Sequence, residues 1–322
     1  MDRNLRPIAG LADDIWRDIK MRHDTNPGAI TGLSTGFSKL DDLIDGVRPE
    51  TLIIIGARPK QGKTALLLSI MMNMAKADIK TAFFSLEMPE KQVISRLIAI
   101  EAEVSHQLMV RGIYTEEEGN RLEVAIAEVS DWPLIIDDTA GLTPSAFTDR
   151  AQRAVDDGAR AVFLDYLQLM RPDKSAGKRY EVVTEVSMAV ANARKIIKAP
   201  IIAAAQLNRK VVDRASKPTF SSIKNSIEEV TRPNDGDLRD SGQLEQDGDA
   251  VIFLNRPIAV LEKMKPTGCS AHSSEMIEWE AACSKYRRLA ELNVYYNRAG
   301  PSGFVNLLFD GAQMLFKENP LG

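Results

Sequence analysis

A glycine-rich turn carries the clearest chemical signal in the sequence. It consists of Gly56, Ala57, Arg58, Pro59, Lys60, Gln61, Gly62, Lys63 and Thr64. An apolar stretch precedes it and an amphipathic stretch follows it, which is typical of a phosphate-binding loop between a strand and a helix. Backbone N–H groups of such a turn can surround an anion at the positive end of the helix, Lys63 can reach the β and γ phosphates, and the Thr64 hydroxyl can ligate Mg²⁺. The strict pattern has glycine where Ala57 stands, so the first glycine is displaced by one position to Gly56.

Three polar residues stand directly after other short apolar stretches. Asp165 would emerge at the carboxyl edge of a parallel sheet, beside the phosphate loop, as the Walker B carboxylate that helps Thr64 to organise Mg²⁺. Phosphoryl transfer to water also needs a group that activates the water. Glu87 could be that group, or it could start the next helix, since acids favour helix N-termini. Gln206 could sense the γ phosphate or could cap a loop.

The surrounding pattern predicts the elements that position these residues. From residue 51 onward, short apolar stretches alternate with longer helical ones, which indicates an α/β fold with a mostly parallel central sheet flanked by helices. The predicted strands are 52–56, 81–85, 134–136, 161–164, 201–205 and 251–254, nearly all apolar, as strands buried on both faces should be. Residues 292–296 and 304–309 flank a Gly-Pro-Ser-Gly turn and predict an antiparallel hairpin at the sheet edge. Two stretches, 210–237 and 257–288, resist assignment, apart from helical character around 275–289.

Composition excludes several classes of protein. The 322 residues include 41 Lys plus Arg against 45 Asp plus Glu, so a surface coated with positive charge for bulk nucleic-acid adhesion is not expected. Two cysteines, Cys269 and Cys283, cannot build a disulfide framework and fit a reducing compartment. Neither a secretory signal nor an apolar stretch long enough to span a membrane is present, so we expect a cytoplasmic protein.

Apolar residues recur at helical spacing near the N-terminus. Ile8, Leu11, Ile15, Trp16 and Ile19 predict one amphipathic helix that ends before an Asn-Pro-Gly breaker. Such a helix usually packs on its own domain, and the alternative is that it docks on a neighbouring subunit.

Several sequence blocks follow the phosphate loop in a defined order. They are 84–89 (FSLEMP), 164–170 (LDYLQLM), 205–209 (AQLNR), 237–242 (DLRDSG), 244–250 (LEQDGDA) and 298–303 (RAGPSG). Together with the loop they resemble the RecA-like motor domain of DnaB-type replicative helicases, from about residue 30 to residue 316. The resemblance implies a RecA-like P-loop NTPase core that uses ATP and Mg²⁺. It divides the chain into a linker helix and connector, residues 1–29, and a motor domain, residues 30–322, without the family's N-terminal primase-interacting domain.

The resemblance also implies roles for individual residues. Glu87 becomes the catalytic base and Gln206 the sensor that links the γ phosphate to the DNA side. The family forms ring-shaped hexamers with ATP between subunits, and Arg298 falls on its arginine finger, which is supplied in trans to the neighbour's site. Where the family usually carries a lysine two residues before the finger, this sequence has Tyr296. In the family the linker helix packs on the adjacent motor domain, so the resemblance favours neighbour docking for residues 8–21.

Two loops are predicted to contact DNA. The residues concerned are Arg171, Lys174, Lys178 and Arg179 in the first loop, and Arg239, Asp240, Ser241 and Gly242 in the second. Contacts through cations and backbone amides carry little sequence information, so we expect sequence-tolerant binding to single strands.

The sequence therefore predicts an ATP-dependent DNA helicase of the DnaB-like replicative type, which translocates on single-stranded DNA as a homo-oligomeric ring. A helicase loader or a primase would be its further partners. The alternatives are a RecA-like recombinase or recombination mediator, and an ATP-switched helicase-associated assembly factor. The inserts at 222–236 and 262–288 have no assigned role.

Overall fold

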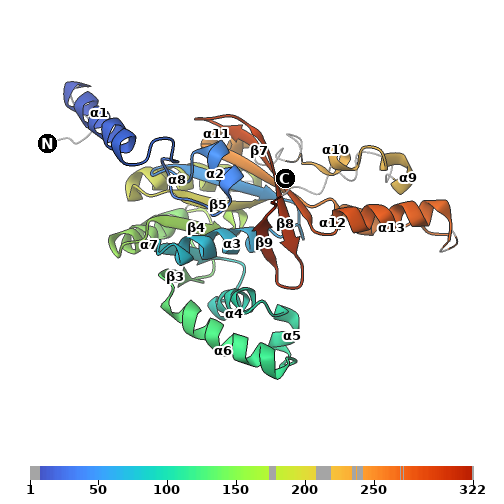
Figure 1. Ribbon diagram of the computed structural model, residues 1–322. Helices are drawn as coiled ribbons and strands as arrows, with labels where there is room; N and C mark the ends of the chain where they lie inside the picture. Colours follow the sequence, from blue (N-terminus) through green and yellow to red (C-terminus); the bar gives the residue numbers. More distant parts are fainter. Residues whose placement is uncertain are drawn as a thin grey trace.

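The computed structural model describes residues 8–173, 179–207, 219–233, 237, 242–268, 270 and 272–320. Within these residues one nine-stranded sheet forms the centre of the molecule, and helices cover both of its faces (Figure 1). The strands are β1 (Leu52–Ala57), β2 (Thr81–Ser85), β3 (Leu134–Asp137), β4 (Ala161–Asp165), β5 (Ile201–Gln206), β6 (Ala250–Asn255), β7 (Leu289–Asn297), β8 (Gly303–Asp310) and β9 (Leu315–Glu318). Their order across the sheet is β3-β2-β4-β5-β1-β6-β7-β8-β9.

The helices alternate with the strands along most of the chain. They are α1 (Ile8–Thr25), α2 (Ser38–Ile44), α3 (Lys63–Lys76), α4 (Glu90–Glu101), α5 (His106–Val110), α6 (Glu116–Asp131), α7 (Pro144–Asp156), α8 (Arg179–Ile197), α9 (Phe220–Ile223), α10 (Ile227–Thr231), α11 (Gly242–Asp247), α12 (Ile258–Leu261) and α13 (Ser274–Tyr286), with 3-10 turns η1 (Leu167–Leu169) and η4 (Glu262–Met264). None of the helices in the described ranges has the length and apolar character needed to cross a membrane.

The predicted fold class is confirmed. Strands β1 to β6 pair in parallel, and each begins and ends within one residue of its predicted bounds. Strands β7, β8 and β9 continue the sheet in antiparallel pairing. The predicted hairpin is therefore present as β7 and β8, but it does not form the sheet edge, because β9 pairs outside it. Strand β9 was not predicted. It has only four residues, two buried and then two exposed, so it shows no alternation of apolar and polar side chains.

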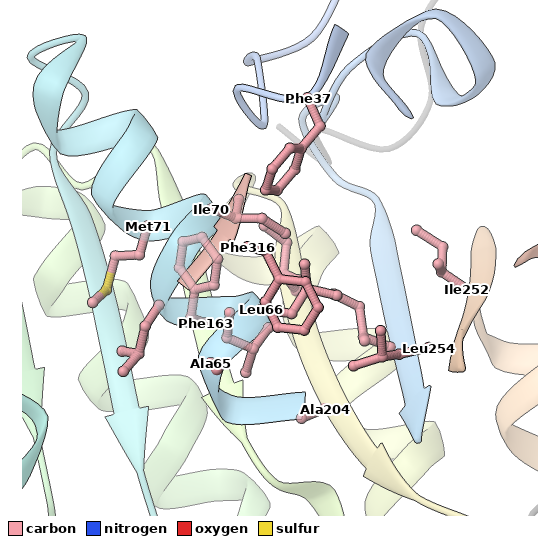
Figure 2. Packing of buried hydrophobic residues seen from close by; sticks show 14 of the residues in the cluster. Phe37, Ala65, Leu66, Ile70, Met71, Phe163, Ala204, Ile252, Leu254 and Phe316 are labelled. Carbon is pink, nitrogen blue, oxygen red and sulfur yellow. The ribbon is translucent and has the colours of Figure 1, made fainter. Parts of the chain in front are cut away.

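Buried apolar side chains form a core on each face of the sheet. Ile53 and Ile55 of β1 belong to the core beneath α3, whereas Leu52 and Ile54 belong to the core beneath α7 and α8. Figure 2 shows the first of these cores, where side chains of α3, the parallel strands and Phe316 of β9 meet. A fully buried side chain of this size contributes about 1.5–3 kcal/mol relative to exposure. The phosphate loop therefore emerges from a rigid, doubly covered strand.

Helix α1 is present as predicted, but it does not pack on its own domain. Ile8, Ile15, Trp16 and Ile19 are all exposed, and α1 extends away from the sheet (Figure 1). Among the described residues, no tertiary core includes an α1 side chain. Of the two alternatives for this helix, packing on its own domain is not seen among the described residues, and docking on a neighbouring subunit stays a prediction.

The two stretches without an assignment pack against each other. Helices α9 and α10 from the first stretch and α12 and α13 from the second share a small apolar core beside the sheet. Lys224 forms an ion pair with Glu278 at 2.8 Å, and the Tyr286 hydroxyl donates to Glu228 at 2.9 Å. Insertions far apart in sequence thus form one accessory unit at the carboxyl end of β6.

Candidate nucleotide-binding site

The phosphate loop adopts a conformation that requires glycine. Gly62 has φ 95°, in the left-handed region, and caps the N-terminus of α3. A Cβ added there would lie 3.2 Å from the Phe316 ring. Lys60 also has a positive φ, 69°. This loop directs backbone N–H groups at the positive end of α3, which is the arrangement that binds phosphate.

Three side chains predicted to hold phosphate and metal meet at the start of α3. The Thr64 hydroxyl donates to Asp165 Oδ2 at 2.6 Å, and Lys63 Nζ lies 3.3 Å from Asp165 Oδ1. Lys63 Nζ also lies 3.6 Å from the centre of the Tyr166 ring, a cation–π contact. Burial lowers the pKa of Lys63, and the carboxylates of Asp165 and then Glu87 oppose that shift. The Lys63 ammonium is thus nearly buried beside a carboxylate, in a place where the phosphates of a nucleotide could also pair with it.

Glu87 lies between β2 and α4 and is exposed. It is not part of α4, whose first turn carries Glu90 as its acid, and the Glu90 N–H donates to the Asp138 carboxylate at 3.0 Å. A role for Glu87 as the start of the helix is therefore not supported by the geometry. Its carboxylate acts electrostatically on Lys63 of the phosphate loop.

Arg96 is a site residue that the sequence reasoning missed. It lies on α4, and burial lowers its pKa while Asp165 and Glu87 oppose the shift. Both acidic groups of the site therefore act electrostatically on this guanidinium. One signal could have revealed it: Arg96 follows Val93 by three residues and precedes Ile100 by four, so it stands on the buried face of an amphipathic helix.

Gln206 ends β5 opposite Ala57, at the same sheet edge as the phosphate loop. Its side chain is exposed, and its backbone is held by another residue that the sequence reasoning left without a role. The Gln168 side chain accepts from the Gln206 N–H at 3.1 Å and donates to the Gln206 carbonyl at 3.2 Å. Gln168 thus fixes the end of β5 to the turn that follows β4.

Arg298 lies near the amino ends of the parallel strands, whereas the phosphate loop lies at their carboxyl ends. It follows β7, whose last residue pairs with Ala250 at the start of β6, and Ala250 pairs with Ile53 near the start of β1. The phosphate loop follows the other end of β1. Arg298 therefore cannot reach the phosphate site of its own chain.

Arg298 is nevertheless ordered by specific contacts. Its guanidinium forms an ion pair with Asp249 at 3.0 Å and donates to the Gln246 carbonyl at 3.2 Å, yet half of the side chain is exposed. A hydrogen bond with the side chain of Tyr296 raises the pKa of Arg298, and Asp249 adds to that shift. Tyr296, two residues before Arg298, thus contacts the arginine.

The phosphate loop is also tied to the segment that precedes the second predicted DNA loop. Arg58 forms a buried ion pair with Asp237 at 2.9 Å, with side-chain exposures of 8% and 0%. Arg58 also donates to the Thr231 carbonyl at 3.1 Å. This contact joins the phosphate loop to α10 and to the first residue of the DLRDSG block.

A further group lies on the other side of the loop, at the end of β6. The Arg256 N–H donates to Gln61 Oε1 at 2.6 Å, and the Arg256 guanidinium lies 3.8 Å from the centre of the Phe309 ring. Burial lowers the pKa of Arg256 to about 10, so it remains charged at neutral pH.

The predicted DNA contacts are only partly described. Arg171 is exposed after η1, and its backbone N–H donates to the Leu142 carbonyl at 3.1 Å. Arg179 and Gly242 begin α8 and α11. Lys174, Lys178, Arg239, Asp240 and Ser241 lie outside the described residues.

Comparison with known proteins gives a consistent family match. Residues 32–318 match the family model described as the DnaB-like helicase C terminal domain. The chain is 32% identical to replicative DNA helicase DnaB of Rickettsia bellii over 96% of its length, and 34% identical to that of Leifsonia xyli over 90%. It spans about three fifths of these curated relatives, 61% and 57% of their respective lengths.

Solved structures agree with this match. A DnaB-like replicative helicase, described together with its interactions with primase, has a TM-score of 0.76 and 28% identity, with 95% of this chain and 66% of that one covered. A second structure, of an ATPase domain, has a TM-score of 0.77 and 28% identity, with 95% and 98% covered. The matches favour the helicase over the recombinase and assembly-factor alternatives.

Proposed function

We propose, because the chain belongs to the DnaB-like helicase C-terminal domain family, that it is an ATP-driven motor that unwinds DNA by moving along one strand as a ring of identical subunits. One observation carries this proposal. The phosphate site lies at the carboxyl ends of the parallel strands and comprises Lys63, Thr64 and Asp165. Arg298 lies at the opposite ends of the same sheet. A subunit built in this way can present its arginine only to another subunit.

The nucleotide would bind with its phosphates on the loop. Backbone amides around Gly62 and the Lys63 ammonium would hold the β and γ phosphates, which replace Asp165 as the principal partner of the lysine. The nucleoside would then extend toward Arg256, because the Arg256 N–H donates to Gln61 of the loop from the end of β6.

The residues present fit a magnesium ion. Thr64 and Asp165 contribute a hydroxyl and a carboxylate within 2.6 Å of each other, and Mg²⁺ prefers oxygen ligands combined with substrate phosphates and water. Among the described residues no cluster of three acidic, histidine or cysteine side chains could hold a metal by itself. When bound, Mg²⁺ would neutralise charge on the β and γ phosphates.

Glu87 would activate the attacking water. It is exposed and makes no helix-cap hydrogen bond to α4, so its carboxylate is free to orient toward the γ phosphate. Arg96 would add positive charge near Glu87, because Asp165 and Glu87 both act electrostatically on its guanidinium. Gln206, at the same sheet edge, would report the state of the γ phosphate to the DNA-facing loops.

Arg298 would complete the site of the neighbouring subunit. A cation that arrives only when subunits are correctly arranged stabilises transition-state charge and makes hydrolysis depend on assembly. Asp249 and Tyr296 hold the arginine in a defined orientation before that contact. The exposed apolar face of α1 would dock on the same neighbour, which supports a ring, and by family likeness a hexamer.

Single-stranded DNA would be held by backbone contacts. Arg171 lies exposed at the carboxyl edge of the sheet, beside the strand end that carries Asp165. By family likeness the second loop, which includes Arg239, would grip successive phosphates. The primase named with one structural relative makes a primase a candidate partner for this chain as well.

A strand-displacement assay on a forked duplex, with ATP and Mg²⁺, tests this function. The unmodified chain should release the displaced strand, and Lys63→Ala should not, because nucleotide binding is lost. An exposed substitution far from the site, Glu116→Ala, should behave as the unmodified chain. Equal unwinding by the Lys63→Ala chain would refute the proposed function.

A further inference from the structure

A cluster of charged side chains lies behind Arg298, at the amino ends of β1 and β6. Asp249, directly before β6, is its centre, and the Asp249 side chain is 15% exposed. Asp249 Oδ1 pairs with the Arg298 guanidinium at 3.0 Å, and Oδ2 lies 3.2 Å from Nε of Arg194 on α8. The Arg194 side chain is only 8% exposed. One carboxylate therefore joins a buried arginine to a half-exposed one.

Backbone hydrogen bonds also fix Asp249. Its Oδ2 accepts from the Leu52 N–H at 2.8 Å, and its own N–H donates to the Leu52 carbonyl at 2.8 Å. The Arg298 N–H donates to the Asp249 carbonyl at 2.8 Å. The carboxylate that pairs with Arg298 is thus attached to the first residue of β1, the strand that leads into the phosphate loop.

Arg194 is held in place by the end of α11. Its Nη1 donates to the Asp247 carbonyl at 3.1 Å, and the Ser187 hydroxyl donates to the Asp247 carboxylate at 2.6 Å. Ser187 and Arg194 both lie on α8, so two hydrogen bonds attach α8 to α11. A planar guanidinium with fixed partners can hold the Asp249 carboxylate in one orientation.

The charges of the cluster favour an anion at its exposed side. A carboxylate paired with Arg298 alone would offset much of the attraction of that arginine for a phosphate. Here two cations share one anion, so Arg194, Asp249 and Arg298 together carry a net positive charge. The Arg298 guanidinium has more N–H donors than its bonds to Asp249 and Gln246 use, so donors remain for an anion while both bonds are kept.

We propose that Arg194 is a positioning residue for Arg298 and acts through Asp249. It orients the shared carboxylate and balances its charge, so that Arg298 meets the phosphates of the neighbour's nucleotide as an ordered cation. This inference rests on the proposed function, because Arg298 meets phosphates only where subunits assemble around ATP. The competing view is that Arg194 only packs α8 against the start of β6.

Substitutions of Arg194 test the role in assembled rings. Arg194→Met removes the charge and keeps much of the side-chain length. It should lower kcat for ATP hydrolysis by about tenfold with unchanged KM for ATP, because a displaced cation weakens the transition state more than the bound nucleotide. Arg194→Lys keeps the charge and should recover most of that loss. Lys195→Met, which removes an exposed cation from the next position of α8, is the matched control and should hydrolyse ATP normally.

Two further measurements separate positioning from packing. Arg194→Met subunits keep their own phosphate site, so mixing them with Glu87→Gln subunits should raise hydrolysis severalfold above the average of the separate variants. A subunit damaged throughout its fold would give no such recovery. Asp249→Asn combined with Arg194→Met should be no slower than Asp249→Asn alone, because Arg194 acts only through that carboxylate.

Three results would overturn the positioning role and leave the proposed function intact. They are normal turnover by Arg194→Met, no recovery in mixtures where mixed rings are shown to form, and additive losses in the double variant. Normal turnover by Arg298→Ala would instead refute the proposed function, and the positioning role with it.

Discussion

The buried ion pair between Arg58 and Asp237 allows a quantitative prediction. Asp237→Ala would leave the Arg58 guanidinium 8% exposed and without its carboxylate, with only carbonyl acceptors such as that of Thr231. Removing one partner of a buried pair typically costs about 3–5 kcal/mol, because the remaining charge stays desolvated. We therefore expect the free energy of unfolding to fall by about that amount, measured by urea denaturation without nucleotide at a fixed protein concentration.

An exposed ion pair is the matched control. Lys80 and Asp157 lie closer together, at 2.7 Å, but the Asp157 side chain is 69% exposed. Such pairs contribute about 0–1 kcal/mol, so Asp157→Ala should cost little. The double change Arg58→Leu with Asp237→Leu removes both charges and should recover much of the stability lost in Asp237→Ala. If Asp237→Ala is no more destabilising than Asp157→Ala, burial does not increase the contribution of the Arg58–Asp237 pair to the free energy of unfolding.

The phosphate site and the proposed DNA contact support three further predictions. Glu87→Gln should lower ATP turnover by about 10²–10⁴-fold with unchanged ATP affinity, measured by steady-state hydrolysis and calorimetry; turnover within tenfold of normal would remove Glu87 as the base. Gly62→Ala should destabilise the chain by more than the roughly 1–2 kcal/mol that a left-handed alanine costs, because its Cβ also meets Phe316 at 3.2 Å. Gly112→Ala, at φ 70° with open space around it, is the control, and equal losses in thermal denaturation would contradict the packing argument. Arg171→Ala should reduce the salt dependence of single-strand binding by about 0.7 in log–log slope, and an unchanged slope would place Arg171 away from the DNA.

Local patterns predicted the sheet well because its parallel strands are short, apolar and separated by clear helical stretches. The phosphate loop and Asp165 were also predictable, since a strand end fixes where its next residue emerges. The strand β9 was not, because four residues with one buried pair give no alternation to detect.

Residues that depend on tertiary contacts were harder to predict. The Gln168 side chain forms a hydrogen bond with the backbone of β5, 38 positions away, and the sequence around Gln168 gives no sign of that contact. The position of Arg256 against the Phe309 ring and beside a cavity could not be predicted, because both depend on the tertiary fold. The accessory unit combines helices of four or five residues from one insertion with α13 from another, and such short helices carry no periodicity. For α1 the apolar stripe predicted the helix correctly but could not identify what covers it.

The proposed mechanism requires that each ATP site takes its catalytic base, Glu87, from one subunit and its arginine, Arg298, from the next. Mixing Glu87→Gln subunits with Arg298→Ala subunits tests it most directly, because neither variant forms a complete site alone. In randomly mixed rings about a quarter of the interfaces join an intact Glu87 to an intact Arg298, so ATP hydrolysis should return to roughly that fraction of normal. Mixtures as inactive as the separate variants, under conditions where mixed rings are shown to form, would contradict the account.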